Sequence, residues 1–453
     1  MFTIPKMINR RTKNRQYNRV VRLFLILLIL GVSDLAYGQI GAPPVDSLKA
    51  DSLRKVKDRL KPTAVPVSQQ YDFRDLVHDI FTPHKQPDST KKRSGITVIP
   101  NVASNPTIGS QIGIKAVAGK VLGHEPGTLL SVAATSASIT TKGIIYFYIN
   151  HNVFTPGNRW NFQGSLVAAK SVSPDNGLGI GNGNYSSPAD IILSDPTRKA
   201  YGIHSLYFNL REKVYKKIAK DLFLGAGLSF DIRRNITTNV GDTVLTPYKV
   251  YNERYGFSNS GYSSNGFLFN IEYTTRDNQN RAYKGVYLDA GFRINQTWIG
   301  STKNAVQFNY DFRKYFSLSS SNPQHVIAFW NWGAAVVTGQ LPYLELPGTG
   351  RDGAFRSGRG YLNSFFRGTQ FDYTEVEYRF PILRNNFLSG VAFGNLQTAN
   401  DRLGTKIFET WQPGGGAGLR VLFDKTTRTN LCLDYAWGKY NSKGFFLGLN
   451  EAF

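Results

Sequence analysis

The sequence predicts an all-β protein, a 16-stranded antiparallel transmembrane β-barrel with a short N-terminal periplasmic tether. Three observations support this prediction. The N-terminus has the pattern of an export signal, residues from Gly95 onward alternate between apolar and polar side chains, and the long connections follow only odd-numbered segments. After Val32, no apolar stretch reaches the length of about 18 residues that a spanning helix needs.

The export signal is expected in residues 1–38. Seven basic residues within positions 1–22 precede the apolar run Leu23 to Val32, and Ala36-Tyr37-Gly38 follows. This order is typical of a secretory signal peptide, and its apolar run is too short to span a bilayer. We expect cleavage near Gly38 and no lipid anchor, because no cysteine follows the site.

Composition excludes several kinds of site. Cys432 is the single cysteine, which excludes a disulfide framework, a cysteine-based zinc site and an iron–sulfur cluster. The six histidines have no metal-ligand spacing, so we expect no cofactor and no metal. Lys and Arg number 54 against 31 Asp and Glu. In an exported chain this excess points to arginines in the lumen and to anionic lipid headgroups, not to nucleic acid.

Residues 39–94 differ from the rest of the chain and predict a periplasmic tether with one or two short helices. The segment is rich in Pro, Asp and Lys and is too short for several folded domains. Leu76, Ile80 and Phe81 form an apolar face. That face either docks on or inside the barrel, or the helix simply packs on the barrel surface.

Alternation with period two dominates residues 95–453. In residues 220–233 every even position from Leu222 to Ile232 is apolar, and the same division recurs in 284–296 and 305–313. Strands of a soluble sandwich average about 5 to 6 residues, whereas these segments have the length of about 9 to 13 that crosses a bilayer when tilted. The pattern therefore favours a barrel with its apolar face in lipid.

Sixteen such segments can be counted, an even number as a closed antiparallel barrel requires. They are approximately 96–105, 110–122, 128–139, 142–153, 159–169, 202–212, 220–233, 266–276, 284–296, 303–315, 325–338, 371–380, 387–397, 415–424, 429–438 and 444–453. The long connections 170–201, 234–265, 339–370 and 398–414 all follow odd-numbered segments. Long outer loops and short periplasmic turns are typical of outer-membrane barrels. In the last segment, the odd positions Phe445, Leu447, Leu449 and Phe453 would face lipid.

Several motifs resemble one known family. They are Tyr273-Thr-Thr-Arg-Asp-Asn278 with Lys284-Gly285, Arg359-Gly360-Tyr361 with Phe366-Arg367 and Glu377-Tyr-Arg-Phe-Pro381, and the closing segments around Gly416, Asp434 and Gly444 to Phe453. Over roughly residues 95–453 the chain resembles the bacterial surface antigen family, the barrel domain of the BamA/TamA superfamily of outer-membrane assembly and translocation proteins. The Arg-Gly-Tyr motif falls between the eleventh and twelfth segments, which is the family's position for it.

The resemblance implies that Arg359 is carried by a long loop into the lumen and meets a carboxylate there. In the family the partner is an aspartate on the thirteenth strand, where this chain has Ala392. By alternation Glu375, Glu377 and Asp434 face the lumen, so we expect Glu377 or Glu375 to replace it, with Asp434 as the third candidate. A buried guanidinium needs such a partner. In the alternative interpretation, Arg359 is one of many solvated loop arginines.

The resemblance also implies a working seam between the first and last strands. Pro100 cannot donate a ladder hydrogen bond, and the last strand contains Gly444 and Gly448 before it ends at Phe453. A seam with fewer ladder bonds opens more readily. The plainer interpretation is that Pro100 marks a frayed strand start.

The leading functional hypothesis is a non-enzymatic barrel that inserts or translocates proteins or lipids at the bacterial outer membrane. Relatives carry repeated periplasmic domains that this chain lacks, so the expected partners are outer-membrane lipid and a barrel assembly machinery, a periplasmic delivery protein or a client protein. The second hypothesis is a passive diffusion channel or a structural surface protein. The third is a barrel-embedded hydrolase, for which we find no G-x-S-x-G motif and no Walker loop. The glycine-rich run Gly177 to Gly183 misses G-x-G-x-x-G and is interpreted as a flexible turn.

Overall fold

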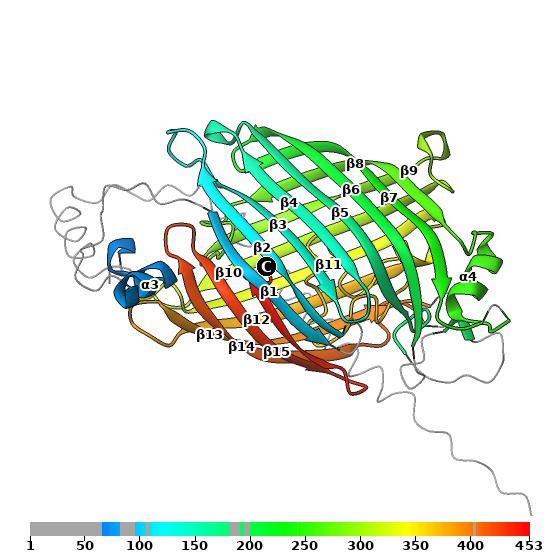
Figure 1. The fold of residues 1–453 in the computed structure, drawn as a ribbon. Helices are drawn as coiled ribbons and strands as arrows, with labels where there is room; N and C mark the ends of the chain where they lie inside the picture. The colour runs from blue at the N-terminus through cyan, green and yellow to red at the C-terminus, as the bar shows by residue number, and fades with distance from the viewer. Residues whose placement is uncertain are drawn as a thin grey trace, which may run out of the picture. The chain divides into compact units, whose positions relative to one another are not determined.

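The sixteen strands predicted from the sequence form one closed antiparallel barrel in the computed structural model (Figure 1). The structure describes residues 66–81, 96–105, 109–181, 191–193, 200–241, 243–401 and 405–453. The signal peptide, most of the tether and the end of the glycine-rich run lie outside these residues. Every strand pairs with its neighbours in sequence, and β1 meets β16. The fold class and the number of strands are therefore confirmed.

The strands and helices have the following bounds. The strands are β1 (Ile96–Asn105), β2 (Gly109–Val121), β3 (Leu130–Thr140), β4 (Ile145–Phe154), β5 (Trp160–Asp175), β6 (Tyr201–Ala219), β7 (Leu222–Thr238), β8 (Tyr262–Thr274), β9 (Gly285–Asn295), β10 (Ala305–Ser317), β11 (Val326–Gly339), β12 (Gln370–Pro381), β13 (Leu388–Ala399), β14 (Gln412–Asp424), β15 (Thr429–Gly438) and β16 (Lys443–Leu449). The helices are η1 (Val67–Gln69), α3 (Phe73–Phe81), η2 (Pro156–Asn158), α4 (Pro247–Tyr255), η4 (Thr297–Ile299) and η5 (Tyr343–Glu345).

Four strands, β5, β6, β7 and β16, differ in length from the expectation. β5, β6 and β7 have 16, 19 and 17 residues, because their ladder continues past the predicted ends as far as the pair Asp175 and Tyr201. β16 has only 7 residues and ends at Leu449, not at Phe453. The expected sixteenth strand was therefore too long.

The barrel presents its apolar face outward. Large apolar side chains are exposed along the outer wall, among them Ile112, Leu224, Phe269 and Phe292. Many of the inward positions between them are polar or charged and are buried, as Asp231 and Arg293 show. Only a surrounding of lipid makes such an exterior favourable, so the wall is built to span a bilayer. Among the described residues, no helix is long and apolar enough to cross a membrane.

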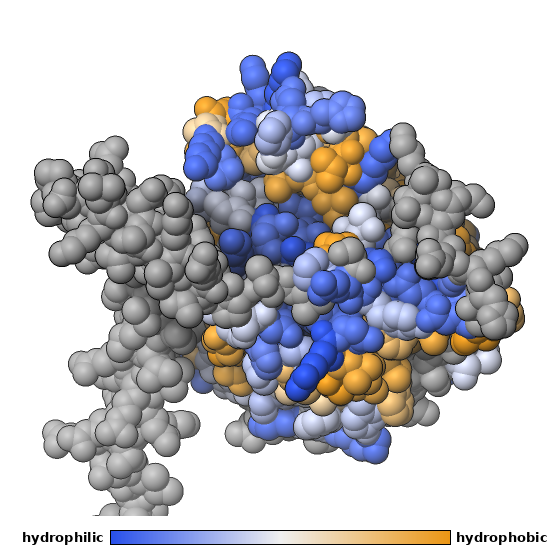
Figure 2. Space-filling view, turned by 90° about the vertical axis from the view of Figure 1, so that its left-hand side faces the viewer, coloured by the Kyte–Doolittle hydropathy of each residue, from blue (hydrophilic) through white to orange (hydrophobic). Residues whose placement is uncertain are grey.

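Helix α3 packs on the short turns at one end of the barrel. Phe73 stacks on Phe423 at a ring distance of 4.8 Å, and the Asp75 carboxylate pairs with Lys425 at 2.6 Å. Ile80 and Phe81 remain 61% and 76% exposed. The helix thus packs on the surface through a face other than the predicted one. The end of the molecule that carries α3 shows a hydrophilic hollow between hydrophobic patches (Figure 2).

The lumen is filled by three segments that leave the wall. They are the loop of residues 340–369 between β11 and β12, the turn of residues 275–284 between β8 and β9, and the C-terminal tail of residues 450–453. The tail and the loop join the inner faces of β11 and β12 in one buried apolar cluster that includes Trp330, Tyr361 and Phe453. The wall and these segments together position the charged side chains around Arg359.

Candidate functional site

Arg359 lies at the centre of a buried carboxylate cluster in the lumen. Its Nη2 donates to the carboxylates of both Glu375 and Glu377, and its Nε donates to Glu375 Oε2 at 3.2 Å. Its Nη1 donates to Asp434 Oδ2 at 3.1 Å. The structure thus brings Arg359 together with all three carboxylates that the alternation pattern turned inward. The guanidinium also lies 3.5 Å over the ring of Phe393.

Electrostatics hold Arg359 in its charged form. Burial disfavours the charge, but the carboxylates of Glu375, Glu377 and Asp434 outweigh burial and keep the pKa of Arg359 above its usual value. Removing one partner of a buried ion pair leaves a charge without compensation, at a cost of about 3 to 5 kcal/mol. The loop is therefore held firmly against β12 and β15.

A second group of arginines surrounds these carboxylates. Arg379 pairs with Glu377 at 2.6 Å, and Arg420 pairs with Asp434 at 2.5 Å and with Glu451 at 2.6 Å. Arg281 of the inward turn lies 3.4 Å from Glu451. These residues and Arg359 form a network of four arginines and four carboxylates, which we call the lumenal charge network. It joins the loop, the turn, the tail and β12, β14 and β15.

Sequence reasoning missed Glu451 and Arg281 as members of this network. Glu451 was assigned to a sixteenth strand, and Arg281 to a short turn. By alternation Arg420 also faces the lumen, and an inward arginine in need of a second anion was the signal that could have found Glu451. The alternation of apolar and polar residues does not predict that the tail, residues 450–453, turns into the lumen.

The other residues of the Arg-Gly-Tyr motif fix the loop against β14 and β15. Gly360 has a φ of 99°, and a Cβ at this position would lie 2.5 Å from the carbonyl oxygen of Trp437. The Tyr361 hydroxyl donates to the Pro413 carbonyl at 2.6 Å and accepts from the Lys439 amide at 2.8 Å. At position 360, only glycine permits both the positive φ and the close approach to the Trp437 carbonyl.

Arg367 holds the other end of the loop through carbonyl groups. It donates to the Pro174 carbonyl at 2.8 Å and to the Tyr343 carbonyl at 3.2 Å, and it lies 4.3 Å over the Tyr343 ring. Arg367 thus ties the loop to the outer end of β5. In the part of the chain that the structure describes, it has no ion pair with a carboxylate.

Within the described part of the chain, the seam between β1 and β16 has one paired position, Ser104 opposite Phe445. By contrast, β1 pairs with β2 along all ten of its residues, and β15 pairs with β16 at seven positions. Pro100 lies on the seam strand β1, and Gly444 and Gly448 lie in β16 opposite Ala436 and Cys432 of β15. The barrel is therefore joined at one end of the seam only.

Phe453 does not face lipid, so this expectation was wrong. Its ring stacks on Trp330, and its carbonyl oxygen accepts from Arg379 Nη2 at 2.9 Å. Asn450 adopts a left-handed φ of 67°, which turns the tail into the lumen, and Glu451 then meets Arg420. Leu449 is also buried, against Ile99 and Val117. The pairing of Glu451 with buried arginines outweighs any gain from extending β16 along the wall.

The fold resembles solved outer-membrane barrels. CdiB from Escherichia coli matches with a TM-score of 0.52 at 10% identity over 79% of this chain and 63% of that chain. This chain has the fold of the CdiB barrel. BamA from Haemophilus ducreyi lacking POTRA domains 1–3 matches with a TM-score of 0.48 at 13% identity, over 80% and 71% of the two chains.

CdiB from Acinetobacter baumannii matches with a TM-score of 0.46 at 12% identity, over 78% of this chain and 58% of that chain. The chain thus spans less than two thirds of the two CdiB chains that it matches. No family model matches the sequence, and no curated protein matches it. The likeness to CdiB agrees in fold with the resemblance inferred from the motifs.

Proposed function

We propose that this protein is an outer-membrane barrel that inserts or translocates proteins or lipids by opening between β1 and β16. The observation that carries this proposal is the single paired position of the seam, Ser104 with Phe445. The exported, lipid-facing barrel supports a bacterial outer-membrane location. The fold shared with CdiB supports the assignment to a translocation barrel of the BamA/TamA type.

The cost of opening favours this seam over every other strand pair. A ladder hydrogen bond contributes about 0.5 to 1.5 kcal/mol net. Separating β1 from β2 breaks a ladder of ten paired positions, whereas separating β1 from β16 breaks a ladder of one. Opening the seam exposes the edge of β1, and an exposed edge is a template for an incoming strand.

The filled lumen supports a lateral route over a central one. The lumenal charge network fixes the loop inside the barrel through Arg359, and the tail occupies the space beside Trp330. A passive diffusion channel needs a continuous aqueous path, which these segments narrow. We therefore propose that the loop and the tail act as an inner support while the seam opens. No catalytic residue takes part in this mechanism.

We also propose that a delivery protein binds the end of the barrel that carries α3. Ile80 and Phe81 of α3 are exposed there, next to the short turns of the barrel. This separate protein would bring the client. Surrounding lipid is the second partner, at the apolar outer wall.

A disulfide across the seam tests the proposal. Ser104→Cys with Phe445→Cys, in a Cys432→Ser background, would join β1 to β16 at their paired position. The matched control, Leu433→Cys with Leu447→Cys, joins β15 to β16 in the same background. In cells whose only copy of the protein is the seam-disulfide variant, we expect the amount of outer-membrane protein or lipid to fall, as measured by quantitative analysis of their envelopes. A reducing agent should restore that amount. An unchanged envelope with a fully formed seam disulfide contradicts the proposal.

Single-channel recording separates the proposal from a passive channel. A plugged translocation barrel gives small or erratic conductance, and a diffusion channel gives a steady open level. The measurement uses the mature protein in a planar bilayer. A steady open level would favour the channel.

A further inference from the structure

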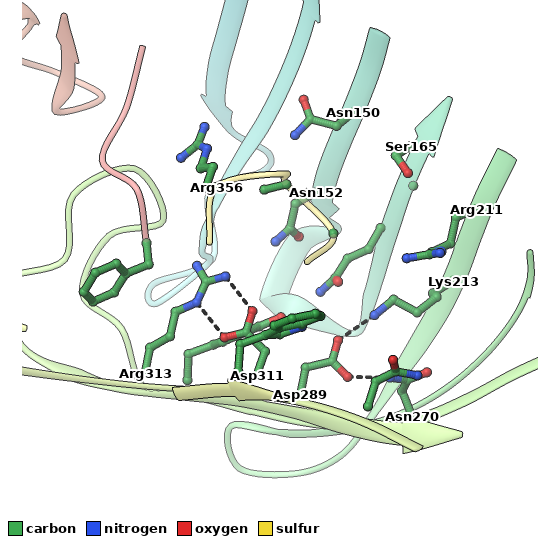
Figure 3. A pocket seen from close by; sticks show the side chains of 18 of the residues that line it. Asn150, Asn152, Ser165, Arg211, Lys213, Asn270, Asp289, Asp311, Arg313 and Arg356 are labelled. Carbon is green, nitrogen blue, oxygen red and sulfur yellow. Dashed lines mark hydrogen bonds and ion pairs between the residues drawn. The ribbon is translucent and has the colours of Figure 1, made fainter. Parts of the chain in front are cut away.

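A partly open space in the lumen has a composition that the proposed function does not explain. A cavity of about 340 Å³ lies between the loop, the tail and the inner faces of β4, β5, β6 and β8 to β11. Figure 3 shows Arg356 of the loop on one side of this space and Arg211 of β6 on the other, with Asn150 and Asn152 of β4 along the wall. We call it the lumenal cavity.

The lumenal cavity carries an excess of positive charge. Seven of its lining residues are Lys or Arg, and three are Asp or Glu, namely Asp289, Asp311 and Glu451. These three carboxylates are already paired, with Lys213 at 2.5 Å, with Arg313 at 2.6 Å and with Arg420 at 2.6 Å. They leave no negative charge for the remaining cations that line the cavity.

Arg276 is the clearest of these remaining cations. It is 6% exposed, lies 4.0 Å over the ring of Tyr287, and donates from Nε to the Thr274 hydroxyl at 3.4 Å. Among the described residues, no carboxylate forms an ion pair with it within 4.0 Å. A nearby anion stabilises the charge of a buried guanidinium, so Arg276 is a favourable place for a negatively charged ligand.

Arg356 and Arg211 are two further arginines that line the cavity. Arg356 donates to the backbone carbonyls of Glu451 and Leu449, which are neutral acceptors. Arg211 lies 3.8 Å from Asp231, whose carboxylate is held more closely by Arg293 at 2.7 Å. Among the described residues, Arg276 and Arg356 thus line the cavity without an ion pair, and Arg211 shares the carboxylate of Asp231 with Arg293.

Neutral polar groups complete the wall of the cavity. The side-chain oxygens of Asn150 and Asn152 and both polar atoms of Gln279 are buried and, within the described part of the chain, have no hydrogen-bond partner. Amides both donate and accept, which is the chemistry that recognises hydroxyl groups. Tyr148 and Trp332 supply apolar surface beside them.

We propose that the lumenal cavity binds a small anionic ligand that also carries hydroxyl groups, of the chemical class of a sugar phosphate. Guanidinium groups recognise phosphate through paired, charge-assisted hydrogen bonds, and the amides take the hydroxyl groups. The volume of about 340 Å³ lies at the lower end of ligand sites. It therefore fits a monosaccharide, either free or as the headgroup of a phosphoglycolipid.

The ligand would also hold the loop in the lumen. Arg356 belongs to the loop and Arg211 to the barrel wall, on opposite sides of the cavity, so a ligand that contacts both joins the two parts. Binding would stabilise the plugged barrel, because the ligand binds only where both arginines are present. This coupling gives the test a second readout.

Calorimetry on the mature full-length protein in detergent tests the proposal directly. The probes are glucose 6-phosphate, glucose, inorganic phosphate and micellar lipid A. We expect glucose 6-phosphate to bind at least tenfold more tightly than glucose or phosphate. Arg276→Gln and Arg211→Gln should each weaken binding about tenfold, because each removes a charge-assisted contact. Arg254→Gln, on the exposed surface of α4, is the matched control and should leave the affinity unchanged.

Trypsin supplies the second readout, since bound glucose 6-phosphate should slow cleavage of the loop at Arg351 and Arg356. Binding of lipid A in place of glucose 6-phosphate would support the site and assign it to a lipid headgroup. The proposal is overturned if neither glucose 6-phosphate nor lipid A binds, or if glucose binds as tightly as glucose 6-phosphate. It is also overturned if Arg254→Gln weakens binding as much as Arg276→Gln. Folding of each variant is checked by its heat-dependent mobility on SDS gels. Arg276→Lys, which keeps the charge, should retain more affinity than Arg276→Gln.

Discussion

The rings of Phe453 and Trp330 stack in the lumen with their centroids 5.1 Å apart. This contact holds the C-terminus inside the barrel, and the chain leaves the wall after Leu449. By the register of Ser104 with Phe445, residues 450–453 would otherwise lie opposite residues 96–99, so the inward turn of the tail leaves that end of the seam edge of β1 without a ladder partner. The position of the last residue therefore accounts for part of the weakness of the seam.

Phe453→Ala should lower the stability of the barrel by about 3 kcal/mol, because a buried aromatic ring is replaced by a cavity. The measurement is the temperature at which half of the protein loses its folded mobility on SDS gels. Phe445→Ala is the control, since Phe445 is 58% exposed on the outer wall. Equal effects of the two substitutions would show that the lumenal contact contributes nothing.

Arg359→Ala should release the loop, because it leaves Glu375, Glu377 and Asp434 without their shared cation. Glu377→Gln should release it less, since two carboxylates remain. The rate of tryptic cleavage within residues 351–367 reports the release. Identical cleavage of wild type and both variants would mean that Arg359 does not hold the loop.

His151 and Glu212 form an ionisable pair on the lipid-facing wall, with Nε2 3.1 Å from the carboxylate. His151 Nδ1 also lies 3.2 Å from the Phe162 carbonyl and must donate to it. His151→Leu should destabilise the barrel by about 1 to 3 kcal/mol, because it leaves a lone carboxyl group in lipid.

The double variant His151→Leu with Glu212→Leu is the control for this prediction. It removes both polar groups and should recover most of the lost stability in the same gel assay. A double variant as unstable as His151→Leu would show that packing at this position, and not the pairing of charges, is the cause.

Glu451 should contribute to acid sensitivity. Burial opposes its ionisation, but Arg420, Arg379 and Arg281 outweigh burial and hold the pKa of Glu451 below its usual value. The folded protein therefore favours the carboxylate, and this stabilisation is complete above the unfolded pKa of about 4.3 and is lost as the pH falls further. Glu451→Gln should flatten the fall in unfolding temperature below about pH 4. An unchanged pH profile would contradict this role.

Much of the candidate site follows from period-two alternation. Alternation turned Glu375, Glu377 and Asp434 inward, and the motif around Arg359 supplied their cation. In a barrel with one face in lipid, each strand has only one register that satisfies its apolar side chains. Inward residues are therefore predictable from the sequence, even where this chain has Ala392 in place of an acid.

The sequence by itself determined the sixteen strands, their order and the face of most strand residues, because these properties depend on local periodicity and on connection length. The tertiary structure alone decided where the tail goes, how α3 packs and which cations meet in the lumenal cavity. Glu451 enters the lumen because Arg420, far from it in sequence, lies there. Such pairings depend on distances across the closed barrel, which local periodicity does not specify.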